Sequence, residues 1–217
     1  MVLSVPFDLH TLLTYCAAAA ALVVAPGPAQ ALVITRSIQG GTRGGLLTSV
    51  GLEIGTIIHT VAAAIGLSAI LASSATAFLV VKYAGAAYLI VLGFLMLRRS
   101  AGVTKADGLQ EPPAVNGGRL VLHAAMTGVL NPKVAVFFLA FLPQFVDPRR
   151  GAVLLQFLIL GMILGTLGLI CDSTIAVIAG RVRHRLDASG RFAAWRERVT
   201  GTVLVALGLR LAMADRS

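Results

Sequence analysis

Charged side chains are scarce in this sequence, and acidic ones are the scarcest. Of 217 residues, 12% are charged and only 9 are Asp or Glu, whereas 57% are hydrophobic. The mean hydropathy is +0.89. A soluble domain of this size could not bury so much apolar surface. The composition therefore excludes an ordinary soluble protein and predicts a protein that lies in lipid.

The sequence has only two cysteines, and no lysine or arginine precedes residue 36. The two cysteines, Cys16 and Cys171, form no CxxC motif and no metal-ligand spacing, which argues against a thiol/disulfide electron carrier and a structural metal site. The first basic residue is Arg36, so the first apolar run lacks the charged start of a secretion signal. Cleavage at the A-x-A sequence 29–31 is therefore the minor alternative.

Long uncharged runs make up much of what remains. They span Thr11 to Ile34, Thr60 to Val81 and Gly151 to Cys171. Each is near or above the roughly 20 residues that a helix needs to cross a membrane. The runs do not alternate between apolar and polar residues, which excludes a membrane β-barrel. The sequence predicts an all-α polytopic membrane protein with six helices, near residues 9–36, 43–72, 75–98, 119–146, 150–181 and 194–213.

We expect a single transmembrane domain over residues 1–217, with a polar loop at about 100–118. With six crossings, the connections after helices one, three and five lie on one side and carry 12 of the 18 basic residues. The positive-inside rule then places both termini outside the cytoplasm, in a multi-pass cell (inner) membrane protein. The net charge of +9 orients the chain and contacts anionic lipid, so no nucleic-acid partner is expected.

Two of the expected helices are interrupted by proline. Pro26-Gly27-Pro28 lies inside the first helix, and Asn131-Pro132-Lys133 lies inside the fourth. Proline removes a backbone donor and clashes with the preceding turn, so both helices should open at membrane depth. One such proline alone is more often a structural kink. Two breaks in corresponding places indicate a binding site at the membrane midplane.

The two halves of the chain match elsewhere. Helix two carries Gly51-x3-Gly55 and helix five carries Gly161-x3-Gly165, small-residue steps that let helices approach closely. Helix three reads Lys82-x-x-Gly85 where helix six reads Arg198-x-x-Gly201. Two three-helix units in series point opposite ways through the membrane. We therefore expect two inverted repeats, residues 1–99 and 119–217, with helices one and four broken.

Glu53 and Asp172 are the carboxylates well inside expected spans, where charges are costly and usually functional. Helical geometry puts Asp172 on the face of Gly161, Gly165 and Gly168. Glu53 lies nearly opposite Gly51 and Gly55, so it should face a cavity or a partner charge.

Three further titratable residues have more than one interpretation. Lys133 follows the second break and could lie in the site, pair with Asp172, or cap freed carbonyls. His59 is a candidate proton relay or a hydrogen-bonded structural histidine. Lys82 either belongs to the site or reaches to the outer surface.

Several motifs, in order over nearly the whole chain, resemble the LysE family of amino-acid exporters, in particular its RhtB-like branch, which is associated with homoserine and threonine export. They are VAPGPAQAL, GLEIGTIIH, VKYAGAAYLIVLGFLMLRR, LNPKVAVFFLAFLPQFVDP, Asp172 and GTVLVALGLRLA. The resemblance implies a six-helix inner-membrane carrier that exports amino acids by using the proton gradient. The motif positions carried over are Pro26, Gly27, Pro28, Gly51, Gly55, His59, Lys82, Gly85, Tyr88, Asn131, Pro132, Lys133, Pro143, Gln144 and Asp172.

Glu53 departs from the family pattern, in which a neutral residue is common, and would suit a cationic substrate. We expect amides near Gly27 to hold the substrate carboxylate, and Asp172, with Glu53, to receive the ammonium or exchange it for a proton. The alternatives are an exporter of another small metabolite or ion, an electron carrier, or a noncatalytic scaffold. No enzymatic activity, cofactor or metal is expected. The substrate, the coupling ion and self-association into a homo-oligomer are left open.

Overall fold

The computed structural model describes residues 7–25, 27–73 and 116–182, with scattered positions between 76 and 98 and between 202 and 209. Every regular element in these residues is helical, which confirms the all-α class. The elements are α1 (Leu9–Val24), α2 (Pro28–Ser73), α4 (Gly117–Val129), α5 (Pro132–Val136), the π-helix η1 (Phe137–Phe141), the 3-10 helices η2 (Leu142–Phe145) and η3 (Pro148–Arg150), and α6 (Val153–Val182).

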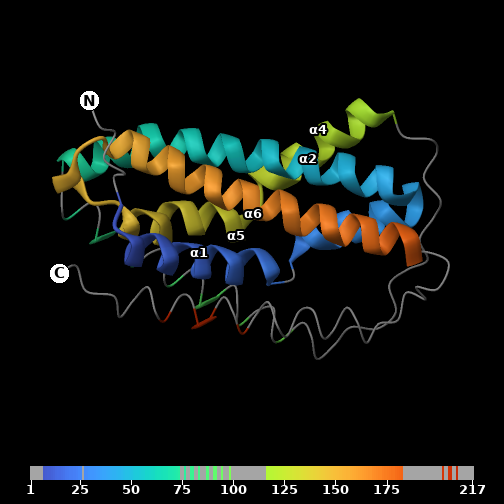
Figure 1. Cartoon of the computed structure of the whole chain (residues 1–217), viewed down its shortest axis with the longest axis horizontal. Coiled ribbons are helices and arrows are strands. Elements are labelled where there is room, and N and C mark those ends of the chain that lie inside the picture. Colours follow the sequence, from blue (N-terminus) through green and yellow to red (C-terminus); the bar gives the residue numbers. More distant parts are fainter. Residues whose placement is uncertain are drawn as a thin grey trace.

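A turn at Gly41 divides α2 into two antiparallel arms, residues 28–40 and 42–73. Gly41 has φ 66° and ψ −171°, a conformation that side chains other than glycine rarely adopt. A Cβ on Gly45 would collide with the Ser37 hydroxyl, although residues eight apart in a straight helix are about 12 Å from each other. In Figure 1 the blue part of the chain turns back at the right-hand end and continues as α2 beside α6. The turn separates the helices expected at 9–36 and 43–72.

Among the described residues, two stretches are long and apolar enough to cross a membrane: Pro28–Leu67, which contains the Gly41 turn, and Val153–Val182. A third candidate is the pair Gly117–Val129 and Pro132–Phe145, which is bent by 46°. The helices expected at 75–98 and 194–213 lie largely outside the described residues. The six-helix count and the inverted repeats therefore stay predictions.

Glycines line the contacts of α2 with its neighbours. On one face of α2, a Cβ on Gly55 would lie 2.7 Å from the backbone of Gly128 in α4, and Gly51 is equally close to α4. On the α6 side, a Cβ on Gly161 would collide with Thr60 of α2. Because these glycines have no side chains, α2 packs closely against both α4 and α6.

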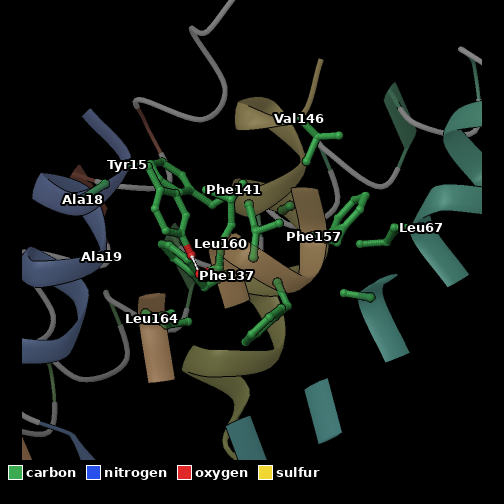
Figure 2. Packing of buried hydrophobic residues seen from close by; sticks show 14 of the residues in the cluster. Tyr15, Ala18, Ala19, Leu67, Phe137, Phe141, Val146, Phe157, Leu160 and Leu164 are labelled. Atoms are coloured by element: carbon green, nitrogen blue, oxygen red, sulfur yellow. Dashed lines mark hydrogen bonds between the residues drawn. The ribbon is translucent and has the colours of Figure 1, made fainter. Parts of the chain in front are cut away.

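An aromatic cluster joins α1 to the α5–α6 region (Figure 2). Tyr15 is completely buried, and its hydroxyl donates a 2.7 Å hydrogen bond to the carbonyl of Leu160 in α6. Its ring lies against Phe137 and Phe145, with centroids 6.0 and 5.2 Å away. A buried hydroxyl needs such a partner, so this bond fixes α1 against α6.

A polar network holds the start of α1 near the turn before α6. Asp8 accepts a 2.7 Å hydrogen bond from the Thr11 amide and forms a 3.2 Å ion pair with Arg150. The Thr11 amide, the Thr11 hydroxyl and Arg150 together lower the pKa of the Asp8 carboxyl. Gln156 is completely buried and bonds both the amide and the carbonyl of Asp147 at 2.9 Å. These contacts order one end of the molecule.

Candidate functional site

A cavity of about 70 Å³ lies where the two helix breaks meet. Its walls come from α1, both arms of α2, α4, α5 and α6, and we call it the central cavity. This volume exceeds the roughly 10–15 Å³ that one water molecule occupies on the same scale. Six polar side chains line it: Gln30, Glu53, Thr56, Asn131, Lys133 and Asp172.

The first break, between Val24 and Pro28, frees carbonyls at the end of α1. The Lys133 ammonium donates a 2.6 Å hydrogen bond to the carbonyl of Ala25. The Gln30 amide donates a 2.7 Å bond to the carbonyl of Val23. Lys133 is buried, with 7% of its surface exposed. Both partners of the freed carbonyls are therefore side chains that also line the central cavity.

The second half of the broken helix begins at the cavity wall. The first bond within this helix runs from the Ala31 amide to the Gly27 carbonyl, at 3.0 Å. The amides of Ala29 and Gln30 come before it and have no acceptor within the helix. Both residues line the cavity. A Cβ on Gly27 would lie 3.8 Å from Lys133 Nζ, so this helix N-terminus and an ammonium group are close together, a combination that favours anions.

At the second break, between Val129 and Pro132, the backbone groups are hydrogen-bonded by Asn131 and approached by His59. The Asn131 side chain accepts a 3.1 Å hydrogen bond from the Lys133 amide and so caps α5. His59 Nε2 lies 3.0 Å from the carbonyl of Val129, the last residue of α4. The ring of His59 stacks on Phe138 at 5.8 Å. His59 is not among the residues that line the central cavity.

Two carboxyl groups reach the cavity from facing helices. Asp172 of α6 is buried, with 7% exposed. Glu53 of α2 faces α6, where a Cβ on Gly165 would lie 3.1 Å from Glu53 Oε2. This Oε2 atom is buried and has no hydrogen-bond partner. Within the described part of the chain, neither carboxyl forms an ion pair with Lys133.

The structure brings four of the expected site residues to the central cavity: Glu53, Asn131, Lys133 and Asp172. Pro28 and Pro132 begin the two half-helices beside it. Of the motif positions further along, Pro143 is buried in η2, and Gln144 donates to the Ala140 carbonyl at 2.9 Å. The expected positions Pro26, Lys82, Gly85 and Tyr88 lie outside the described residues.

Gln30 and Thr56 line the cavity although the sequence interpretation did not select them. That interpretation selected ionisable residues, helix-breaking residues and the carried-over motif positions, and Gln30 and Thr56 belong to none of these sets. One signal for Gln30 was available. It is a polar residue in the first turn after a helix break, where a side chain reaches back to the freed carbonyls.

The family model and the similar proteins all indicate a membrane protein, and several of the similar proteins are named for efflux. Residues 20–215 match the family described as LysE type translocator. An uncharacterized membrane protein of Vibrio cholerae is 33% identical, covering 95% of this chain and 98% of its own length. A homoserine/homoserine lactone efflux protein of Salmonella typhimurium is 33% identical over 89% and 91% of the two chains. A leucine efflux protein of Klebsiella pneumoniae is 28% identical over 95% and 96%. No solved structure matches significantly.

Proposed function

The chain belongs to the LysE type translocator family of membrane proteins, and from this premise we propose that it is a secondary transporter that exports amino acids from the cytoplasm. Relatives named for homoserine and leucine efflux support this class of solute. The proposed substrate is of the homoserine/threonine type or a cationic amino acid, exchanged for protons. The protein would lie in the inner membrane with both termini outside the cytoplasm. The alternative is export of another small metabolite or ion.

The observation that carries this proposal is the convergence of both helix breaks on one cavity that holds groups of opposite charge. An amino acid has a carboxylate and an ammonium. The amides of Ala29 and Gln30, next to the Lys133 ammonium, would hold the carboxylate. Asp172, with Glu53, would receive the ammonium. Asn131 would position Lys133 by capping the helix that carries it.

Alternating access would come from two inverted repeats that rock about the central cavity. A pair of turns supports the repeats. Gly41 and Gly151 have nearly identical backbones, φ 66°, ψ −171° and φ 67°, ψ −171°. Each lies ten residues before the first glycine of a Gly-x3-Gly pair, Gly51 and Gly161 respectively. The same turn thus introduces the corresponding helix in both halves of the chain.

The test is efflux from proteoliposomes that contain the purified protein and a mixture of amino acids, under an imposed pH gradient. We expect selective loss of one class of amino acid from the vesicles. Asp172→Asn should abolish this efflux while the protein still inserts, because the substituted amide gives the ammonium no countercharge. Efflux by Asp172→Asn at the wild-type rate would contradict the assigned site. Retention of every amino acid by wild-type vesicles would contradict amino-acid export.

A further inference from the structure

Glu53 occupies a notch that two glycines of the facing helix leave open. The glycines of its own helix, Gly51 and Gly55, lie against α4, and Glu53 projects toward α6 instead. There, a Cβ on Gly168 would collide with Glu53 Oε1, and one on Gly165 would lie 3.1 Å from Oε2. We call Gly165 and Gly168 the glycine notch. The carboxyl fits against α6 only because these two positions have no side chain.

Among the described residues, the carboxyl in this notch forms no ion pair. Lys133 is the one cation among the described residues that line the cavity, and its ammonium is bonded to the Ala25 carbonyl. Thr56, one turn along α2, donates to the Leu52 carbonyl at 3.5 Å. Within the part of the chain that the structure describes, the Glu53 Oε2 atom is buried and has no hydrogen-bond partner. Ionising the carboxyl therefore costs more than keeping it protonated, because the buried Oε2 atom has no donor to stabilise a negative charge.

The charges around Glu53 favour the same state. Asp172 faces the cavity from α6 and Lys133 from α5, while His59 bonds the Val129 carbonyl outside the cavity lining. If both carboxyls were ionised, two negative charges would face one ammonium that already has another partner. One proton shared by the two carboxyls removes this excess. Glu53 is the better place for it, because its Oε2 atom is fully buried and has no hydrogen-bond partner among the described residues, whereas neither oxygen of Asp172 combines both conditions.

We propose that Glu53 is the group that carries the exchanged proton, whereas Asp172 stays ionised and holds the ammonium of the substrate. The proposal rests on the export function proposed above. When the ammonium enters from the cytoplasm, the Glu53 O–H bond breaks, the proton leaves to cytoplasmic water, and the carboxylate pairs with the ammonium. When the substrate leaves on the other side, Glu53 takes a proton from the water there. One proton enters for each substrate exported.

Two transport assays separate this role from substrate binding. The first measures exchange of labelled homoserine against unlabelled homoserine without a pH gradient. The second measures homoserine efflux driven by a pH gradient. Glu53→Gln, which mimics the protonated carboxyl, should still exchange homoserine, at a lower rate, because Asp172 still holds the ammonium, and it should lose the acceleration by the gradient. Asp172→Asn should lose both activities. Asp8→Asn, a neutralised carboxyl at the exposed start of α1, is the control and should lose neither.

The glycine notch gives a second variant that keeps the carboxyl. Gly168→Ala should displace Glu53 and, like Glu53→Gln, lose the acceleration by the pH gradient. Gly66→Ala in α2 is the matched control, because a Cβ there meets nothing within 4 Å. If Glu53→Gln responds to the gradient as the wild type does, or loses homoserine exchange although it is folded, the proposal is wrong.

An infrared measurement needs no substrate and so does not depend on the export function. The solubilised wild-type protein should show the carbonyl absorption of a protonated carboxylic acid near neutral pH. This absorption should disappear in Glu53→Gln and remain in Asp172→Asn. Its disappearance in Asp172→Asn alone, or its absence from the wild type, would overturn the assignment of the proton to Glu53. This result holds whether or not the vesicles export amino acids.

Discussion

The two helix breaks both contain proline, yet the structure bonds their freed backbone groups in different ways. At the first break, the carbonyls of Val23 and Ala25 accept hydrogen bonds from Gln30 and Lys133, long polar side chains that also face the central cavity. At the second break, the Val129 carbonyl lies against His59, which stacks on a phenylalanine and lies outside the cavity lining.

The different partners of the freed carbonyls suggest different roles for the two breaks. A solute in the cavity would compete for the groups that close the first break, because they are the polar groups it would meet. The closure at Val129 uses the His59 ring, which lies outside the cavity lining. We therefore infer that the first break changes its hydrogen bonds during transport, whereas the second is part of the scaffold. The scaffold still supplies Lys133, which joins the two breaks across 108 residues of sequence.

The substitution with the largest expected effect is Lys133→Met. It removes the cation of the cavity and leaves the Ala25 carbonyl buried without a donor, which costs about 1–3 kcal/mol of stability. We expect loss of amino-acid efflux and a lower thermal midpoint in detergent. Lys133→Arg keeps a cation and should recover part of the stability. Wild-type efflux from Lys133→Met would mean that the first break is not part of the transport site.

Gln30→Leu tests the same break without changing its charge. The Val23 carbonyl loses its donor, and we expect a loss of about 1 kcal/mol in the free energy of unfolding. Amino-acid efflux should weaken, because the side chain that closes the break also lines the central cavity. Gln144→Leu is the matched control, since Gln144 bonds only within its own helical turn and lies outside the cavity lining. Equal effects of the two substitutions would remove the distinction.

The positions of the breaks could be predicted from sequence because proline has no amide to donate. The expected fourth and fifth helices, 119–146 and 150–181, agree closely with Gly117–Phe145 and Val153–Val182. The partner of Lys133 could not be predicted. Attraction to Asp172 and a bond to a freed carbonyl are both favourable for a buried ammonium, and only the packing of α1 against α5 and α6 decides between them.

For Glu53, too, the direction of the side chain on its helix could be predicted from sequence, whereas its neighbours on other helices could not. The helical period of α2 indicated that Glu53 points away from Gly51 and Gly55, and it does. The sequence contained no sign that Gly165 and Gly168 would face it, because the register between α2 and α6 is set by how the two helices pack. His59 was open between a relay and a structural residue, and its 3.0 Å approach to Val129 could not be read from either helix alone.

His59→Phe tests whether the second break takes part in transport. Phenylalanine keeps the stacking on Phe138 and removes the nitrogen that faces the Val129 carbonyl. We expect a stability loss of about 1 kcal/mol, with homoserine efflux per folded molecule and its pH profile unchanged. A shifted pH profile in a stable variant would instead make His59 a proton relay and would place the second break in the transport cycle.

Asn131→Ala is expected to cost about 1 kcal/mol of folding stability, from the lost cap of α5. Asn131→Ser should restore most of that stability, because serine also caps helices. Asn131 touches the cavity, so efflux separates two roles that stability does not. If capping is its only task, serine restores efflux together with the thermal midpoint. If serine restores the midpoint alone, the Asn131 amide contacts the solute, and both breaks then contribute a polar group that transport uses.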